Sequence, residues 1–467
     1  MEFKKSQFSE WYNEIVEISK LTDKRYPVKG MDIWMPYGWA IMQNIDSYYR
    51  TVFNDYGHLE LNFPLLIPKD QFDKEEEHIK GFAKEVFWVE RGGDDRLDVP
   101  LILRPTSETA MYHMFSLWIR THADLPLKIY QIVNVFRYET KQTRTFIRVR
   151  EIHFFEAHTA HKDFEDSEKQ IKENLEIWKK ICEKLAIPYI INKRPEWDKF
   201  PGAFYSLGAD TIMPNGRALQ IGTIHEYSDN FAKPYDIKYN DENGAQKYVC
   251  QTTFGISERL LGAVVGVHGD NHGLILPPEI APIQIIIIPI ITEEKDKVIK
   301  EAKRLYTKLK NKYRVNIDLR EDYTPGFKFY DWELKGVPLR IEIGPRDIKK
   351  NEVVCVRRDT FKKIKVKNKE LGSKIKKLLS TIQRNLYVKA KKQLDALVLE
   401  TEDLKTLKVQ EKIFKVSWCG SEECGNKIAE LSDKSILGVP IEEKKKIGKC
   451  IICGSETDIK AYVGKSY

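Results

Sequence analysis

A change of hydrophobic pattern between residues 277 and 282, where three prolines fall, constrains the fold more than any other feature. Before it, over residues 61–248, short β-branched segments form several hairpin-like pairs, which indicates an antiparallel sheet. After it, Gln284–Ile288 is almost continuously apolar, as in a strand that is buried on both faces. The sequence therefore predicts an α+β domain over residues 1–281, followed by a smaller α/β domain.

Apolar spacing and turn residues predict the individual elements. Helices are expected at Phe8–Lys20, Trp39–Phe53, Asp166–Leu185 and Glu293–Tyr313. Strands are expected at Gly81–Val89, Val99–Leu103, Lys128–Glu139, Arg148–Glu156, Ala218–Tyr227, Gln284–Ile288, Val315–Leu319, Leu339–Ile343 and Val353–Arg357.

A basic stretch begins a third unit, expected over residues 371–467. Twelve Lys or Arg residues and one acid, Glu370, fall between Phe361 and Gln393, so this stretch carries +11. The whole chain carries +8, so the remaining residues sum to −3. Such a run is either a solvated helical face or a surface for a polyanion.

Four of the seven cysteines lie in the last fifty residues. They form a Cx4C pair and a Cx2C pair, a spacing that fits one tetrahedral zinc ion with a structural role. Four unrelated cytosolic cysteines are the alternative. The predicted ligands are Cys419, Cys424, Cys450 and Cys453.

The chain has no apolar run of the ~20 residues that a membrane-spanning helix needs. Its longest run, Ile283–Ile291, contains Pro289, and Met1–Phe8 is too polar for a signal peptide. The odd number of cysteines argues against a disulfide framework. We therefore expect a soluble, cytoplasmic protein.

Charged side chains alternate along two predicted strands that a polar loop connects. One face of such a hairpin suits a polar ligand, because guanidinium groups bind phosphate, carboxylates bind amines and an aromatic ring gives stacking. Cross-strand ion pairs on an exposed sheet are the alternative. The residues are Arg137 and Glu139 on the first strand, and Arg148, Arg150, Phe154 and Glu156 on the second.

Two helix starts carry further candidate residues. Ser257 is a plausible N-cap, and Arg259 would then lie in the first helical turn, where the helix dipole disfavours a cation and an anionic partner would compensate. Thr106 and Glu108 precede another helix. Their simplest role is structural, with Thr106 as the cap and Glu108 complementing the dipole.

Several motifs, taken together, carry a family resemblance. Gly57…Pro64, Phe136–Glu139 with Arg148, and Gly255…Arg259 resemble the three motifs of class II aminoacyl-tRNA synthetases. The segments Arg104–Glu108, Glu156–His161, Gly216–Gln220 and His268–Pro278 resemble the prolyl-tRNA synthetase family. The short spacing between the second and third motifs leaves no room for an editing insertion. This short spacing, the cysteine-rich tail and Ser466-Tyr467 are similar to the archaeal and eukaryotic type of the family.

The resemblance implies a reaction in which proline and ATP form prolyl-adenylate, after which the prolyl group moves to tRNA(Pro). It implies that Arg137 bridges the proline carboxylate and the α-phosphate, and that Glu139 accepts from the adenine amino group. Arg148 and Arg259 would hold the outer phosphates, with Mg2+ between these phosphates. The implied catalytic residues are Arg137, Arg259 and Glu139, and the implied ATP-binding residues are Arg137, Glu139, Arg148, Gln220, Thr223, Ser257 and Arg259. Gln220 and Thr223 differ in strand parity, so either a β-bulge between them or a contact that reaches around the edge of the sheet is needed.

The resemblance also implies a proline pocket. Thr106 and Glu108 would accept from the secondary ammonium, and a ring pocket would surround the apolar part. Phe154 departs from the family pattern, because eukaryotic relatives have Trp there. The implied proline-binding residues are Thr106, Glu108, Arg137, Phe154, Glu156, His158, His225 and Phe82.

Residues 282–370 resemble the anticodon-binding domain of this subgroup. Arg side chains suit guanine edges and acidic groups suit base amines, although solvated loop charges are the alternative. The basic stretch would then follow tRNA phosphates, and a homodimer is implied because the first motif lies at the dimer interface in this family. The implied anticodon-reading residues are Glu333, Arg340, Arg346 and Asp347.

Three other functions stay open at this point: a non-catalytic RNA-binding paralogue, a class II synthetase for histidine, threonine or serine, and a zinc-dependent nucleic-acid binder. Signatures of class I synthetases are not found in the sequence. A methylene group is worth only ~1–3 kcal/mol to an apolar pocket, so alanine or cysteine should be activated at a measurable rate.

Overall fold

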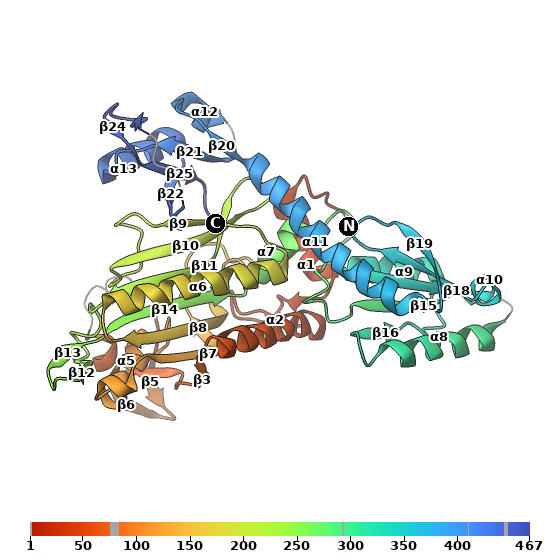
Figure 1. Ribbon diagram of the computed structural model, residues 1–467, viewed down its shortest axis with the longest axis horizontal. Coiled ribbons are helices and arrows are strands. Elements are labelled where there is room, and N and C mark those ends of the chain that lie inside the picture. Colours follow the sequence, from red (N-terminus) through yellow and green to blue (C-terminus); the bar gives the residue numbers. More distant parts are fainter. Residues whose placement is uncertain (1, 75–83, 292–293, 410, 443–446) are drawn as a thin grey trace.

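The computed structural model describes residues 2–74, 84–291, 294–409, 411–442 and 447–467 (Figure 1). Its main feature is an 11-stranded sheet with the order β20-β21-β25-β22-β9-β10-β11-β14-β8-β7-β3. The neighbouring strands from β10 to β7 are all antiparallel, which confirms the predicted sheet. These five strands are β10 (Tyr205–Ile212), β11 (Ala218–Ser228), β14 (Cys250–Ser257), β8 (Glu151–His161) and β7 (Leu127–Phe136).

One face of this sheet is covered by helices that share a single hydrophobic core with it. The longest of them is amphipathic; it begins where Asp163 accepts from the N–H of Asp166 at 2.8 Å, and it ends at Ala186 in the left-handed conformation. Phe155, Ile224 and Phe254 belong to this core, so the residues that alternate with them face the other side of the sheet. The helices are α1 (Phe8–Ile18), α2 (Pro36–Asp55), α6 (Phe164–Leu185) and α7 (Arg259–His268).

The charged hairpin is shorter than the sequence predicts. Strand β7 ends at Phe136 and β8 begins at Glu151, so Arg137, Glu139 and Arg148 lie in the connecting segment and not on the strands. This segment has partners of its own outside the ladder, because the N–H of Arg150 donates to the carbonyl of Gly30 at 2.7 Å. The predicted strand alternation is therefore wrong for these three residues, although the pairing of β7 with β8 confirms the hairpin.

The second sheet has the order β16-β15-β17-β18-β19. Strand β15 pairs with β16 and β17 in parallel, and Ile285–Ile288 are fully buried, so the predicted α/β unit is confirmed. Its strands are β15 (Ile285–Pro289), β16 (Val315–Ile317), β17 (Leu339–Ile343), β18 (Glu352–Arg357) and β19 (Lys363–Lys367), and its helices are α8 (Lys295–Leu309), α9 (Pro325–Leu334) and α10 (Pro345–Lys349).

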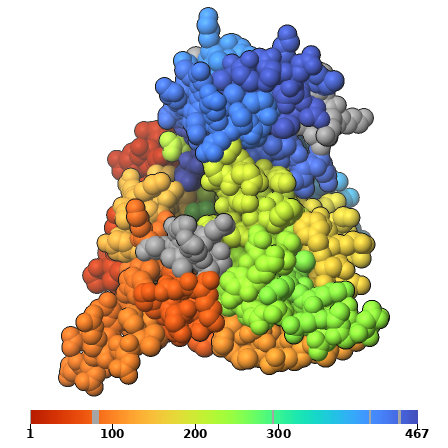
Figure 2. Space-filling model, turned by 90° about the vertical axis from the view of Figure 1, so that its left-hand side faces the viewer, coloured from red at the N-terminus to blue at the C-terminus, as the bar shows by residue number. Residues whose placement is uncertain are grey.

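The third unit returns to the first sheet. Helix α11 (Leu371–Leu397) runs from the second sheet past α7 towards β10 of the large sheet (Figure 1), and Figure 2 shows the blue C-terminal residues against the yellow-green residues of the first unit. Because β22 pairs with β9, the C-terminal strands extend the large sheet. The elements are β20 (Val398–Glu400), α12 (Leu404–Val409), β21 (Ile413–Ser417), α13 (Glu422–Ser432), β22 (Ser435–Pro440), β25 (Lys460–Gly464) and, before them, β9 (Ile190–Lys193).

Shorter elements complete the described part of the chain. The predicted strand Gly81–Val89 begins only at Phe87, and residues 81–83 lie outside the described residues. None of the described helices is long and apolar enough to cross a membrane. The remaining elements are β1 (Thr22–Asp23), β2 (Ile33–Trp34), β3 (Leu59–Glu60), β4 (Leu66–Pro68), α3 (Lys69–Phe72), β5 (Phe87–Gly92), β6 (Asp95–Leu103), α5 (Glu108–Trp118), η1 (His122–Asp124), β12 (Lys238–Asn240), β13 (Gln246–Tyr248), β23 (Gly448–Lys449) and β24 (Glu456–Thr457).

Candidate active site

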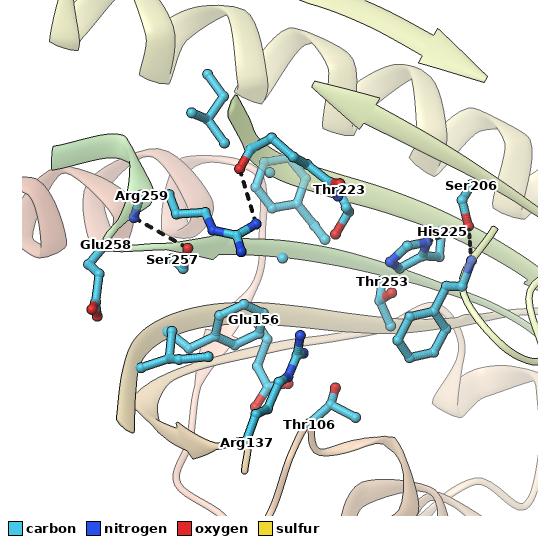
Figure 3. Close-up of a pocket in the computed structure, with 18 of the residues that line it drawn as sticks. Thr106, Arg137, Glu156, Ser206, Thr223, His225, Thr253, Ser257, Glu258 and Arg259 are labelled. Carbon is cyan, nitrogen blue, oxygen red and sulfur yellow. Dashed lines mark hydrogen bonds between the residues drawn. The ribbon is translucent and has the colours of Figure 1, made fainter. Parts of the chain in front are cut away.

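A cavity of about 420 Å³ lies on the face of the large sheet opposite the helical core (Figure 3). It brings together the residues that the sequence placed in the ATP and proline sites, with the exception of Phe82, which lies outside the described residues. The lining residues predicted from the sequence are Thr106, Glu108, Arg137, Glu139, Arg148, Phe154, Glu156, His158, Gln220, Thr223, His225, Ser257 and Arg259.

Three arginines form the cationic part of this cavity. Arg259, at the start of α7, donates from Nε to the carbonyl of Ile147 at 2.8 Å, and Arg137 donates from Nε to the carbonyl of Pro105 at 3.2 Å. Burial, together with the charges of Arg137 and Arg148, lowers the pKa of Arg259 to about 10. Three cations that repel one another in a buried site are stabilised by a bound anion. This part of the cavity is therefore suited to a polyphosphate.

The helix that carries Arg259 starts almost as predicted. Its N-cap is Glu258, one residue after the expected Ser257, but Ser257 Oγ accepts the N–H of Arg259 at 3.3 Å. The carboxyl of Glu258 accepts the N–H of His153 at 2.5 Å and points away from the Arg259 guanidinium (Figure 3). Burial raises the pKa of Glu258 to about 8.

Glu139 and Arg148 form an ion pair at the edge of the same cavity. Arg148 Nη1 lies 2.7 Å from Glu139 Oε2, and the hydrogen bonds from Lys141 N–H and Arg148 outweigh burial, so the pKa of Glu139 is lowered. An ion pair between the two arms of the hairpin, the alternative considered from the sequence, is therefore present here. It lies inside a cavity and not on an exposed sheet.

Buried carboxylates occupy the opposite part of the cavity. Glu108 is only 3% exposed and accepts hydrogen bonds from Thr106 Oγ1 and, at 2.9 Å, from Tyr227 Oη. The proposed capping role of Thr106 is wrong, because its hydroxyl donates to Glu108 and the N-cap of α5 is Ser107. Two buried oxygens held by hydroxyl groups suit the N–H bonds of an ammonium group.

A second buried carboxylate, Glu156, has a network of its own. It accepts from Gln131 Nε2 at 2.8 Å and from the hydroxyl of Ser107, and it lies 3.2 Å from His158 Nε2. Burial would raise its pKa, but these contacts outweigh burial and the pKa is lowered. Glu156 therefore carries a negative charge beside the aromatic part of the cavity.

Aromatic rings line the space between the two charged parts. The ring of His225 lies 4.6 Å from that of Phe200, and its Nδ1 is 2.7 Å from Ser206 Oγ. Burial lowers the pKa of His225 to about 3, so this ring is neutral. With Phe154 it forms an apolar wall suited to a small saturated ring.

A β-bulge is present in β11. Ala209 pairs with Gly222 and Asp210 pairs with Gln220, so one residue of β11 is skipped. Gln220 and Thr223 therefore both line the cavity despite their opposite parity. A Cβ at Gly255 would lie 3.0 Å from the Phe154 ring, so glycine keeps this floor open.

The sequence did not single out several residues that build the site. Phe200 and Ser206 follow a segment without a regular pattern, and Gln131 and Tyr227 lie on strands whose polar positions gave no motif. Neither of the last two lines the cavity itself; each holds a carboxylate that does, Gln131 that of Glu156 and Tyr227 that of Glu108.

The predicted anticodon residues fall into two groups. Arg340 Nη1 donates to Glu333 Oε1 at 2.5 Å, so these two lie together. Arg346 and Asp347 lie in α10, where Asp347 Oδ2 accepts the N–H of Gly344 at 2.9 Å and stabilises the helix start.

The four predicted zinc ligands come together in the C-terminal unit. The ligand atoms of Cys419, Cys424, Cys450 and Cys453 all lie within 4.8 Å of one another. Four thiolates about 2.3 Å from one ion fit within this span, so the cluster is suited to a tetrahedral metal.

Family models match three successive parts of the chain. They are the tRNA synthetase class II core domain (G, H, P, S and T) over residues 87–268, an anticodon binding domain over residues 284–378, and the prolyl-tRNA synthetase C-terminal domain over residues 401–467. The antiparallel sheet with its arginine-lined cavity is thus that of a class II aminoacyl-tRNA synthetase.

Full-length relatives make the assignment more specific. A proline–tRNA ligase of Pyrococcus abyssi is 54% identical, with 98% of each chain covered, and one of Thermoplasma volcanium is 51% identical over the whole of both chains. Prolyl-tRNA synthetase of Giardia lamblia with prolyl-adenylate superposes with a TM-score of 0.96 at 35% identity and 99% coverage of each chain. The enzyme of Cryptosporidium parvum with halofuginone and AMPPNP gives 0.94 at 35% identity, covering 100% of this chain and 99% of that one. The chain belongs to the proline–tRNA ligase family.

Proposed function

We propose that the chain forms prolyl-adenylate and pyrophosphate from L-proline and ATP in this cavity, and then transfers the prolyl group to the 3′ end of tRNA(Pro). The observation that supports this proposal best is the division of the cavity into a part with three guanidinium groups and a part with two buried carboxylates. A zwitterionic amino acid and a polyphosphate would each meet the opposite charge there.

The chemistry joins two anions, so charge neutralisation and alignment matter more than a general base. Arg137 lies between the carboxylates and the other arginines, where it would contact both the proline carboxylate and the α-phosphate. Arg148 and Arg259 would bind the outer phosphates, and Glu139 the adenine amino group. Mg2+ would enter with ATP and add positive charge at the phosphates, and the ionised carboxylate of Glu139 lies in the same cavity.

The proline end has a matching set of groups. Glu108 and Thr106 would accept the two N–H bonds of the secondary ammonium, while Phe154, His158 and His225 would surround the ring. Phe200, which the sequence did not indicate, belongs to the same wall.

We further propose that Glu333 and Arg340 read the anticodon, and that basic residues of α11 contact tRNA phosphates, so that binding weakens as salt rises. Arg346 and Asp347 are proposed to contribute at the neighbouring helix α10. As a translation enzyme the protein would act in the cytoplasm.

A homodimer is proposed from the outer edge of the large sheet. Strand β3 ends the sheet order, and its Leu59 is 70% exposed. Trp118, whose ring contacts Phe63 at 5.8 Å between centroids, is 42% exposed. Large exposed apolar side chains beside an open strand edge are typical of a surface covered by a partner.

The cysteine cluster is proposed to hold a structural zinc ion. All four ligand positions would be filled by thiolates, which leaves no open position for a reacting group. The ion would connect the end of β21, the start of α13 and the β23–β24 turn.

The decisive experiment is ATP–pyrophosphate exchange with each of the twenty amino acids. We expect proline to support the highest kcat/KM by at least tenfold. A higher value for histidine, threonine or serine would identify another class II specificity, and absence of exchange with all twenty would support a non-catalytic RNA-binding protein.

A further inference from the structure

An ion pair whose arginine is buried and whose aspartate is partly exposed connects the segment after helix α7 to the anticodon-binding domain. Arg358 donates to Asp270 through Nη1 at 2.8 Å and through Nη2 at 2.6 Å. The Arg358 side chain is 1% exposed. A bidentate contact of this kind fixes both the distance and the orientation of its partners.

Arg358 also holds Glu333, the proposed anticodon-reading residue. Its Nε donates to the carbonyl of Glu333 at 2.9 Å, while the carboxylate of Glu333 accepts from Arg340. Glu333 is thus held at its main chain by Arg358 and at its side chain by Arg340. Glu333, Arg340 and Arg358 line the same small surface pocket, together with Phe361.

Asp270 is itself held on the catalytic side. Trp11 Nε1 donates to its carbonyl at 3.1 Å, and one carboxylate oxygen accepts the N–H of His272 at 2.8 Å. Asp270 follows α7 by two residues, and the other end of that helix carries Arg259 in the cavity. Ordered contacts therefore lead from Arg259 through α7 and Asp270 to Arg358 and Glu333.

The main chains of the two domains are in direct contact beside this pair. Leu274 N–H donates to the carbonyl of Leu334 at 2.9 Å, and Leu276 N–H donates to that of Gly336 at 3.1 Å. A Cβ added to Gly273, whose φ is +140°, would lie 2.4 Å from the Leu334 Cα. The end of α9, where Glu333 lies, is thus held against the segment that follows α7.

We propose that Asp270 and Arg358 are positioning residues that set the orientation of Glu333 for anticodon reading and fix it relative to α7. This inference rests on the proposed function of Glu333 and Arg340. Neither Asp270 nor Arg358 lines the catalytic cavity, so activation of proline without tRNA should not depend on them.

The test compares the charging of tRNA(Pro) with that of a transcript in which one anticodon base is replaced. Asp270→Asn keeps the size of the side chain and Arg358→Lys keeps the charge, but each removes the bidentate pair. We expect each variant to raise KM for tRNA(Pro) and to lower the cognate-to-altered ratio of kcat/KM tenfold or more. ATP–pyrophosphate exchange without tRNA should stay within twofold of wild type.

Arg314→Lys is the matched control. Arg314 also connects the two domains, because it donates to the carbonyls of Ala281, Pro278 and Glu279, but it does not contact Glu333. The cognate-to-altered ratio of kcat/KM for Arg314→Lys should stay near the wild-type value. An equal loss in this control would show that any weakening of domain contact has the effect, and would overturn the inference.

Two further variants distinguish the positioning role of Asp270 and Arg358 from the anticodon-reading role of Glu333. If Glu333→Gln still discriminates fully between the two tRNAs, the anticodon role of Glu333 is refuted, and the positioning role with it. Glu333→Gln that loses discrimination while Asp270→Asn and Arg358→Lys retain it would refute the positioning role alone. The double variant Asp270→Asn/Arg358→Lys should lower the cognate-to-altered ratio of kcat/KM no further than Arg358→Lys alone. Additive losses in this ratio would show that the two residues act separately and would refute the proposed pair. If the Tm of Arg358→Lys falls well below that of wild type, the isosteric variant Asp270→Asn provides the test of the positioning role.

Discussion

At the scale of single residues, the buried cations and carboxylates of the cavity decide what the site can bind. Arg137 has the central position, since it lies close enough to Glu108, Glu156 and Glu139 for their charges to raise its pKa, although burial lowers it more. It also contributes to the repulsion that lowers the pKa of Arg259.

Arg137→Ala should therefore lose about 3 kcal/mol of transition-state stabilisation, which is roughly a hundredfold in kcat/KM for ATP–pyrophosphate exchange. Arg217→Ala, a substitution outside the cavity, serves as the control. Exchange close to the wild-type rate in Arg137→Ala would show that this guanidinium does not contact the reacting groups.

Glu258 gives a prediction for pH. Its pKa is raised from about 4.5 to about 8 in the folded protein because of burial. A raised carboxyl pKa means that the folded state binds the proton more tightly, so the stabilisation is fully present below pH 4.5 and is lost as pH rises towards 8. The wild-type Tm should thus fall between pH 5 and pH 8.

Glu258→Gln carries no charge to desolvate, so its Tm should fall less over the same range. The difference in the free energy of unfolding should reach a few kcal/mol, since each pKa unit is worth about 1.4 kcal/mol. Glu165→Gln, at a side chain that is 86% exposed, is the control. Parallel Tm profiles for Glu258→Gln and wild type would contradict the assignment.

At the scale of elements, the sequence predicts the strands better than their ends. Arg137, Glu139 and Arg148 do meet in one cavity, yet they leave the strands because the connecting segment finds partners around Gly30. The sequence indicated that Gln220 and Thr223 need either a bulge or a contact around the edge of the sheet, and the structure has the bulge in β11. Phe200 was not predictable, because an irregular segment has no period from which to infer a direction.

The cysteine cluster makes a prediction at this scale. Cys419→Ser should hold much less than the one zinc ion per chain expected of wild type, and the melting transition of the C-terminal unit should move to lower temperature, because structural zinc contributes folding energy. Cys355→Ala, a buried cysteine outside the cluster, should keep its zinc. Atomic absorption and thermal melts provide the two measurements, and a full equivalent of zinc in Cys419→Ser would refute the assignment.

At the scale of the whole molecule, the sequence indicates three units, but the structure places the third on the edge of the first. The continuity of β22 with β9 was hidden because pairing between residues more than two hundred positions apart leaves no local pattern. The proposed domain boundaries at residues 281 and 370 mark changes of pattern along the chain and not the limits of the large sheet.

The absence of a further domain between β8 and α7 in the described chain leads to a prediction about accuracy. This span consists of α6 and strands that belong mainly to the main sheet, so activation must discriminate by the cavity alone. Each ring carbon that a smaller amino acid lacks is worth only ~1–3 kcal/mol to an apolar pocket, so alanine or cysteine should be activated less efficiently than proline but above background. Leucine, which is too large for the ring wall, is the control. Background rates for both small amino acids would contradict this.

Assembly is the last property at this scale. Leu59→Arg, on the open edge of β3, should convert a dimer to a monomer in light-scattering measurements, because a charge would be buried in the interface. Val388→Arg on α11 places the same charge on another exposed apolar residue and should leave the dimer intact. A monomeric wild-type protein at micromolar concentration would refute the proposed interface.

The pairing of Ala218 with residues 465–467 has a consequence for the cavity. Ala218 N–H donates to the carbonyl of Lys465 at 2.8 Å, and Tyr467 N–H donates to the carbonyl of Ala218 at 3.1 Å. Ala218 begins β11 and lies two residues before Gln220, which lines the cavity. The strand that carries Gln220 is therefore anchored at its start by a segment almost 250 residues further along the chain.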